Sequence, residues 1–254
     1  MKVIQSFWTR NSGEILSLKG SWASLESSLS CWALNNELLN RFYDLELYTD
    51  SFGYHILVDV LGLKYDKVHF VFDEFEYPFD SRLWCYNKIY VYSIQSSPFL
   101  HVDGDVFIWR PFPKYLLQSE VVAQNIEIDL PNYVKCLEEI NCTFEHVPKD
   151  YFKIVPGERV LASNAGIFGG QDVDVFKELR VTAYDFLSKN LSNIGKVSTG
   201  FLNIMSEQLP INKLAEKRNL KIEYLLPSAE PPNYLELNHF HNIYDPKGRV
   251  CNLI

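Results

Sequence analysis

The chain has 254 residues, of which 47% are hydrophobic and 22% charged, so it is long enough for one large folded domain. Its net charge of -8 and pI near 5.3 argue against a general surface for nucleic acids or anionic membranes. No signal-peptide pattern and no apolar run of membrane-spanning length are found, so we expect a cytoplasmic protein without an integral membrane segment. Five cysteines without Cys-x-x-Cys spacing predict reduced thiols rather than disulfides or a zinc site.

Strands and helices alternate along the chain, which predicts an α/β fold with a mostly parallel central sheet covered by helices on both faces. Strand-like runs occupy residues 2–9, 42–50, 67–74, 99–102, 120–128, 158–170, 221–226 and 233–241. Apolar residues at helical spacing predict helices within 21–40, 54–61, 81–95, 172–189 and 199–219. Neither a repeat nor a linker interrupts this pattern, so a single domain over residues 1–254 is expected.

The most informative stretch is SSPFLHVDGDVFIWRPF (96–112), in which a buried strand runs directly into Asp103 and Asp105. In α/β sheets, ligands bind beyond the carboxyl ends of the strands, and Gly104 allows a tight turn there. Two carboxylates this close repel each other unless a cation or a proton lies between them. The stretch therefore has three interpretations: a metal-binding Asp-x-Asp, an acid nucleophile with a partner, or an acidic turn.

PFLHVDGDVFI resembles the Asp-x-Asp segment of GT-A nucleotide-sugar glycosyltransferases, with glycosyltransferase family 8 and the capsular-polysaccharide-type transferases as the most similar groups. SNAGIFGG (163–170) resembles the family's Asn-Ala-Gly segment, which lies against donor and acceptor sugars. The resemblance implies a GT-A (Rossmann-like) fold with a nucleotide-binding half at 1–110. An acceptor-binding half with a C-terminal closing segment would occupy 111–254.

The same resemblance implies an enzyme: a metal-dependent hexosyltransferase. It would move a hexose from a nucleotide diphosphate sugar, with UDP-sugar favoured, to an unidentified carbohydrate, peptide or small-molecule acceptor. When the sugar–phosphate bond breaks, negative charge grows on the diphosphate, and a divalent ion held by Asp103 and Asp105 would neutralise it. Hard oxygen ligands suit Mn²⁺ or Mg²⁺, and an imidazole ligand would favour Mn²⁺.

A C-terminal pair supplies the candidate imidazole. Family 8 enzymes place a metal-binding His six positions before a Lys that binds the diphosphate, and His241 and Lys247 have this spacing. The family's intervening glycine is absent. His239 would share a strand face with His241 and is the alternative metal ligand. A surface histidine pair near a turn explains the same residues without a metal.

Other residues are expected to contact the donor. Lys88, with Arg82 as a substitute, precedes the motif where related enzymes place a basic residue for the diphosphate. Phe7 or Trp8 could stack on uracil at the end of the first strand, although core packing explains either ring equally well. The full set of expected donor-binding residues is Ser6, Phe7, Trp8, Thr9, Lys88, Arg82, Asp103, Gly104, Asn164, Ala165, Gly166, Gln208 and Lys247.

Two acids are candidates for the catalytic base. Glu207 and Gln208 resemble the acid–Gln pair found after the sugar-binding strand of related enzymes, and Asp172 follows two glycines. Either acid could contact the acceptor or act as a general base. Helix capping is the alternative role for Asp172.

Three other classes of protein compete with this interpretation. A haloacid-dehalogenase-like phosphatase also starts from Asp-x-Asp, but it expects Thr or Val at Phe107 and places the motif near the N-terminus. A nucleotidyltransferase that makes sugar nucleotides needs a glycine-rich, arginine-bearing loop, which FWTRNSGEIL does not supply. A non-catalytic carbohydrate- or nucleotide-binding module would carry the same residues without turnover.

Overall fold

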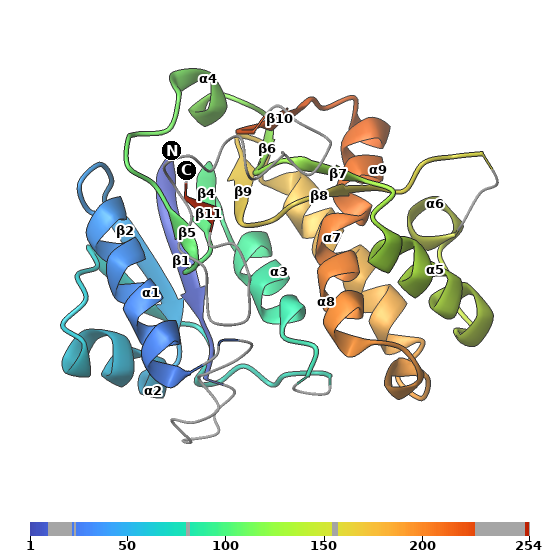
Figure 1. The fold of residues 1–254 in the computed structure, drawn as a ribbon, viewed down its shortest axis with the longest axis horizontal. Helices are drawn as coiled ribbons and strands as arrows, with labels where there is room; N and C mark the ends of the chain where they lie inside the picture. The colour runs from blue at the N-terminus through green and yellow to red at the C-terminus, as the bar shows by residue number, and fades with distance from the viewer. Residues whose placement is uncertain (10–21, 23, 80–81, 154–156, 227–251, 254) are drawn as a thin grey trace. The chain divides into compact units, whose positions relative to one another are not determined.

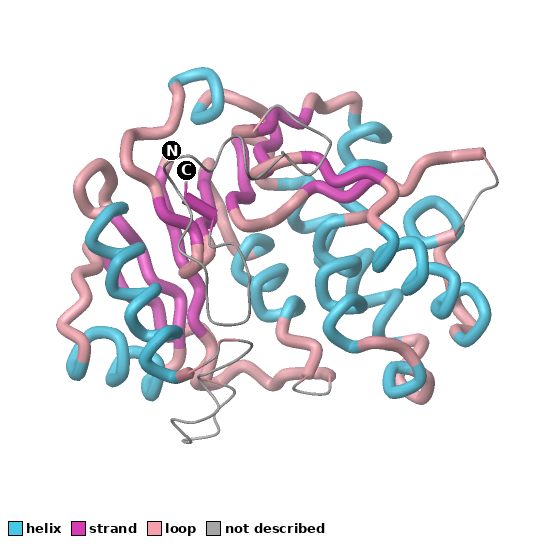
Figure 2. The backbone as a smooth tube through the Cα atoms, viewed as in Figure 1, coloured by secondary structure: helices cyan, strands magenta, loops and turns pink. Residues whose placement is uncertain are grey.

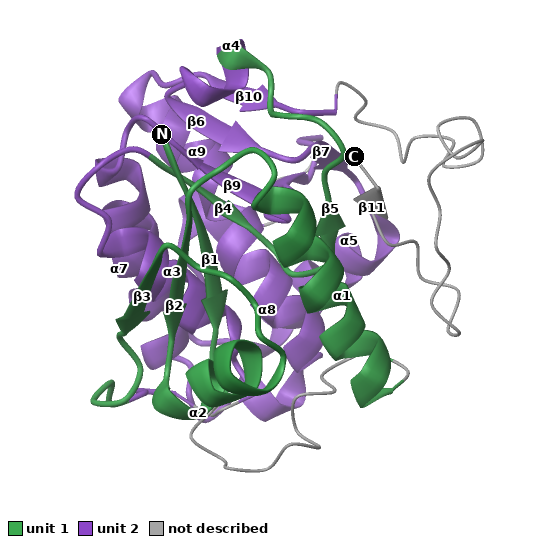
Figure 3. Cartoon of the chain, turned by 90° about the vertical axis from the view of Figure 1, so that its left-hand side faces the viewer, with its two compact units in different colours: residues 1–76, 99–114, 232–254 green, residues 77–98, 115–231 purple. Residues whose placement is uncertain are grey.

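The structure is a computed structural model that describes residues 1–9, 22, 24–79, 82–153, 157–226 and 252–253. The chain forms two compact units, shown in different colours in Figure 3. Unit 1 consists of residues 1–76, 99–114 and 232–254, and unit 2 of residues 77–98 and 115–231. The predicted single domain with halves that meet near residue 110 stays a prediction.

Unit 1 is built on four parallel strands in the order β4-β1-β2-β3 (Figure 1). These strands are β1 (Lys2–Phe7), β2 (Leu45–Thr49), β3 (Lys67–Phe70) and β4 (Phe99–Val102). The register places Val3 of β1 opposite Leu45 of β2 and Leu100 of β4. A short strand β5 (Val106–Phe107) follows β4 and pairs with β11 (Asn252–Leu253).

Helix α1 (Leu25–Leu39) joins β1 to β2 in the sequence and begins at Ser24, whose hydroxyl accepts a hydrogen bond from the Ser27 backbone N–H. Its residues Leu25, Leu29 and Trp32 pack against the buried core of unit 1, which includes Phe7 and Leu47. Helix α2 (Ser51–Tyr54) continues into a π-helix at His55–Val60. α1 thus covers one face of the parallel strands.

Most of the described helices, which are cyan in Figure 2, belong to unit 2. They are α3 (Cys85–Ser93), α5 (Pro131–Thr143), α6 (Lys149–Phe152), α7 (Asp174–Ser188), α8 (Thr199–Gln208) and α9 (Pro210–Arg218), with a 3-10 turn at Ile194–Lys196. α4 (Lys114–Leu117) lies at the boundary of the two units along the chain. Phe152 and Phe186 stack with ring centroids 4.0 Å apart in a core shared by α5, α7 and α8.

Five short strands complete unit 2: β6 (Val121–Ala123), β7 (Ile126–Ile128), β8 (Leu161–Ser163), β9 (Ile167–Gly170) and β10 (Ile222–Tyr224). β6 runs antiparallel to β9 and parallel to β10, whereas β7 and β8 form a separate antiparallel pair. The predicted α/β fold with a mostly parallel sheet is confirmed. None of the described helices is long and apolar enough to cross a membrane.

Two predicted strands differ from the structure in the same way. The runs at 120–128 and 158–170 each divide into two strands. Between the two strands of each run, the Gln124 N–H donates to the Asn164 carbonyl oxygen, and the Asn164 N–H donates to the Asn125 carbonyl oxygen. The sequence analysis also missed helix α5, although its buried Tyr133, Leu137 and Ile140 have helical spacing. The predicted strand at 233–241 lies outside the described residues.

Candidate functional site

The Asp-x-Asp motif lies at the point where the strand order of unit 1 reverses. From β1 the chain adds β2 and then β3 on one side, and β4 joins β1 on the other side (Figure 3). Open parallel sheets bind ligands outside the carboxyl ends of their strands at such a switch point. Asp103 follows the end of β4, and residues 6–9 close β1 beside it. The structure therefore brings these two predicted segments to one edge of the sheet.

A buried network of uncharged side chains holds the main chain of this turn. The Asn35 amide of α1 donates to the carbonyl oxygen of Asp103, at 3.0 Å, and to that of Val106. Its Oδ1 accepts a hydrogen bond of 2.7 Å from Gln5 of β1, whose own Oε1 accepts one of 3.2 Å from the Tyr65 hydroxyl. Burial raises the pKa of Tyr65, so this hydroxyl remains a donor. The sequence analysis identified none of these three side chains.

Gly104 is required by close packing within unit 1. A Cβ at this position would lie 2.5 Å from Cε2 of Trp32 on α1, so a side chain would collide with the indole ring. The Val106 N–H donates to the Asp103 carbonyl oxygen at 3.1 Å and closes the turn. The predicted tight turn is thus present, and its glycine faces an aromatic ring.

The carboxylates of the motif remain accessible to solvent. The side chain of Asp103 is 29% exposed, and Asp105 is exposed. Oδ1 of Asp103 lies 3.5 Å from Nδ1 of His101, and Nε2 of that histidine lies 2.9 Å from the Ser6 hydroxyl. Ser6, an expected donor-binding residue, thus contacts the buried histidine of β4.

Two carboxylates fit a Mg²⁺ or Mn²⁺ ion that completes its coordination with phosphate oxygens and water, as Mg²⁺ commonly does. Within the described part of the chain, no group of three or more His, Cys, Asp and Glu side chains is arranged to hold an ion. His239, His241 and Lys247 lie outside the described residues.

The other expected nucleobase residues have different environments. The backbone N–H and hydroxyl of Thr9 both donate to Oδ2 of buried Asp50, at 2.9 and 2.8 Å. Phe7 belongs to the core of unit 1. Trp8 is partly exposed, and its ring contacts Phe72 with centroids 6.2 Å apart. Of the two aromatic candidates, Trp8 therefore retains more accessible ring surface.

In unit 2, two predicted site residues form a buried ion pair. Nζ of Lys88 lies 3.2 Å from Oε1 of Glu207, and the two side chains are 11% and 2% exposed. The Tyr92 hydroxyl donates to the same carboxylate at 2.7 Å. Burial and the nearby Glu207 carboxylate raise the pKa of the Cys85 thiol well above its usual value, so this cysteine stays protonated. The predicted diphosphate ligand and the predicted base are thus bound to each other.

Asn164 and Gln208 belong to one polar cluster of unit 2. Nδ2 of Asn164 donates to Glu127 at 3.0 Å, and its Oδ1 accepts from the Gly166 N–H at 3.0 Å. The Tyr133 hydroxyl donates to Glu127 at 2.6 Å and also lies 3.3 Å from Oε1 of Gln208. These side chains offer both donors and acceptors, as sugar hydroxyls require.

The remaining predicted site residues are placed as follows. Asp172 caps helix α7, because its Oδ1 accepts from the N–H groups of Asp174 and Val175 at 3.0 Å, and it also pairs with Arg218. This is the capping role that the sequence analysis left open. Ala165 is buried and Arg82 is exposed.

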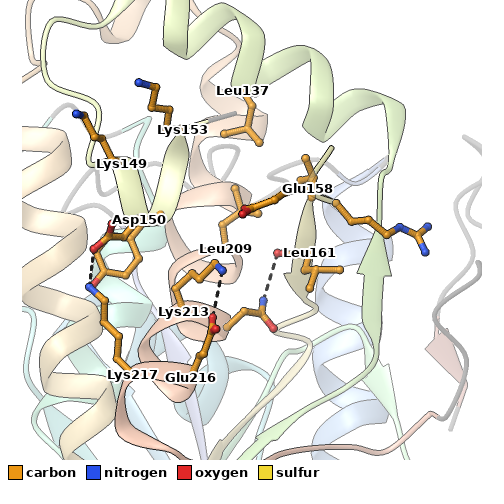
Figure 4. Close-up of a pocket in the computed structure, with 14 residues that line it drawn as sticks. Leu137, Lys149, Asp150, Lys153, Glu158, Leu161, Leu209, Lys213, Glu216 and Lys217 are labelled. Atoms are coloured by element: carbon orange, nitrogen blue, oxygen red, sulfur yellow. Dashed lines mark hydrogen bonds and ion pairs between the residues drawn. The ribbon is translucent and has the colours of Figure 1, made fainter. Parts of the chain in front are cut away.

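A cavity of about 720 Å³ in unit 2 involves none of the predicted site residues (Figure 4). Its lining includes Lys213, which pairs with Glu216 at 3.1 Å, and Lys217, which pairs with Asp150 at 2.8 Å. These two ion pairs neutralise part of the charge in the lining.

Comparisons with known proteins add the following. A family model described as a family of unknown function (DUF6734) matches residues 1–249, whereas no curated protein matches the chain. The solved apo structure of mouse xyloside xylosyltransferase 1 is 10% identical, with a TM-score of 0.40 over 88% of this chain and 84% of that one. 4-diphosphocytidyl-2C-methyl-D-erythritol synthase from Anaerococcus prevotii is 12% identical, with a TM-score of 0.37 over 94% and 95%. Likeness at these TM-scores does not decide a function.

Proposed function

We propose, for a chain that belongs to the family of unknown function DUF6734, that it is a metal-dependent glycosyltransferase. It moves a hexose from a nucleotide diphosphate sugar, with UDP-sugar favoured, to an acceptor such as a carbohydrate. The observation that carries the proposal is the Asp103-Gly104-Asp105 turn at the switch point between β1 and β4. Nucleotides bind at this position in other α/β sheets.

The side chains of unit 1 have separate tasks in the proposed reaction. Asp103 and Asp105 would hold the divalent ion, which would supply positive charge against the diphosphate when bound. Asn35 keeps the main chain of the turn in place through its bonds to Asp103 and Val106. Trp8, at the end of β1 and partly exposed, stacks on the nucleobase.

Unit 2, taken by itself, carries a polar cluster of its own. Asn164, Gln208, Glu127 and Tyr133 form a cluster of donors and acceptors that suits hexose hydroxyls. We assign Glu207 to a structural ion pair with Lys88, because its carboxylate is buried and bound by Lys88 and Tyr92. This role replaces that of a general base.

The proposal is tested by release of UDP or GDP from a panel of UDP- and GDP-sugars, with either Mn²⁺ or EDTA present. The transferase is expected to release the nucleotide slowly to water when Mn²⁺ is present and to stop in EDTA. Asp105→Asn should remove the release, whereas Asp44→Asn, at an exposed position of unit 1, should retain it. Nucleotide binding without any release, in every acceptor mixture tried, would instead indicate a binding module.

A further inference from the structure

His101 links the end of β1 to the Asp-Gly-Asp turn. It lies in β4, is 1% exposed, and has Nε2 2.9 Å from the Ser6 hydroxyl and Nδ1 3.5 Å from Oδ1 of Asp103. Asp103 follows the end of β4, and its Oδ1 nevertheless lies within 3.5 Å of the ring of His101. The result is a continuous row of side chains: Ser6, His101 and Asp103.

The partners of the two ring nitrogens of His101 decide which nitrogen carries the hydrogen. An ionised carboxylate only accepts hydrogen bonds, so the nitrogen that faces Asp103 has to carry a hydrogen. With Nδ1 as the donor of a neutral ring, Nε2 accepts from the Ser6 hydroxyl. The ring is 1% exposed, and its Nδ1 lies 3.5 Å from one oxygen of Asp103.

We infer that His101 is a positioning residue that orients the Asp103 carboxylate for the divalent ion. Carboxylate ligands of metals are commonly held by hydrogen bonds from residues behind them. The inference rests on the proposed function, since it concerns the same ion. At 3.5 Å the contact is longer than a standard hydrogen bond. A small rotation of the partly exposed Asp103 side chain would bring the two atoms within hydrogen-bond distance.

Two replacements of His101 separate this role from simple packing. The amide nitrogen of an asparagine side chain superposes on Nδ1 of histidine, whereas that of glutamine superposes on Nε2. His101→Asn therefore keeps a donor for Asp103 and loses the contact with Ser6. His101→Gln keeps the contact with Ser6 and loses the donor for Asp103. Both variants remove the buried ring, so loss of packing affects them alike.

The experiment titrates each protein with Mn²⁺ alone and measures the free ion by electron paramagnetic resonance, while thermal unfolding in EDTA reports the stability of each variant. We expect His101→Asn to bind Mn²⁺ nearly as wild type does and His101→Gln to bind it about tenfold more weakly or worse. His69→Gln, a histidine replacement in β3, is the control and should leave the affinity unchanged.

Three results would count against the inference. Equal Mn²⁺ affinity in wild type and His101→Gln would show that Asp103 needs no donor from this position. Equal weakening in both His101 variants would assign the histidine to packing alone. Failure of the wild-type protein to bind Mn²⁺ would refute the proposed metal site, and this inference with it.

Discussion

The charged site residues of the two units differ in their exposure to solvent. In unit 1, Asp103 and Asp105 reach solvent while uncharged Asn35, Gln5 and Tyr65 hold the turn from inside. In unit 2, the charges of Lys88 and Glu207 are buried and face each other. In unit 1 the Asn35 amide bonds to main-chain carbonyl oxygens of the turn and not to its carboxylates.

This difference indicates which charges a ligand can use. Burial of a charge is costly unless an opposite charge and hydrogen bonds compensate it, so a buried pair is strongly committed to its own partner. Carboxylates that reach solvent on a turn held from inside have less of this cost and keep a fixed geometry for a cation. We therefore expect loss of a charge to reduce stability in unit 2 and ligand binding in unit 1.

Lys88→Met should have the largest effect on stability. The replacement leaves the buried Glu207 carboxylate without its cation, and breaking a buried pair in this way costs about 3–5 kcal/mol of unfolding free energy. Urea unfolding measures the loss. The double variant Lys88→Met/Glu207→Leu removes both charges and should recover most of it. If Lys88→Met were as stable as wild type, the buried ion pair of Lys88 and Glu207 would not contribute to stability as we expect.

Asp103→Asn and Asp105→Asn should have the next largest effect, on catalysis rather than on stability. Each removes a negative charge from the ion site, and we expect kcat to fall by about 10²–10³-fold, on the scale of one lost electrostatic stabiliser. The melting temperature should stay close to that of wild type, as in the exposed control Asp44→Asn. Wild-type rates in either variant would refute the role of the turn.

Asn35→Asp tests the support of the turn. The side chain keeps its size but loses the amide hydrogens that bond to Asp103 and Val106, at a cost of about 1–3 kcal/mol. Mn²⁺ affinity should fall as well. Asn36→Asp is a matched control on the same helix, because Asn36 bonds to the backbone of Lys64 instead. Equal Mn²⁺ affinities in the two variants would show that Asn35 is only structural.

The smallest predicted effect is a pH dependence of stability at Glu46. Burial alone would raise the pKa of Glu46, but the hydrogen bond from His69 and the charge of Lys2 outweigh it and lower the pKa. A lowered pKa stabilises the fold above the unfolded-state value of about 4.3, and this stabilisation is lost as the pH falls through the folded-state value.

Glu46→Gln measures that contribution. Wild type should exceed the variant in urea midpoint near pH 6 by an amount equivalent to less than about 1 kcal/mol. The difference should shrink as the pH falls through the folded-state value, below which the carboxyl is protonated in both states. If the difference in urea midpoint grew as the pH fell, the pKa of Glu46 could not be lowered in the folded state, and the assignment would be wrong.

Local sequence patterns predicted the parts of the site that depend on local structure. An apolar strand followed by two acids indicated β4 and its turn, and alternation of strands and helices indicated the α/β fold. The role of Asn35 could not be predicted from local sequence, because its partner Asp103 is 68 residues away. Within its helix, asparagine is only a weak helix former and gives no sign of a buried hydrogen bond. The pair of Lys88 and Glu207 spans 119 residues and also depends on tertiary packing.

The ends of short strands were harder to predict for a similar reason. The run at 120–128 looks continuous in sequence, but backbone bonds between Gln124 and Asn164 divide it between two pairs of strands. Those bonds join segments far apart in the chain, so periodicity within one segment does not reveal them.

The central claim is that the Asp103-Gly104-Asp105 turn binds a nucleotide diphosphate through a divalent ion. Calorimetry of UDP with wild type and Asp105→Asn, each with Mn²⁺ and with EDTA, tests it most directly. We predict saturable one-to-one binding by wild type in Mn²⁺, and a large loss of affinity both in EDTA and in the variant. Binding of equal strength under all four conditions, or no binding by wild type in Mn²⁺, would contradict the account.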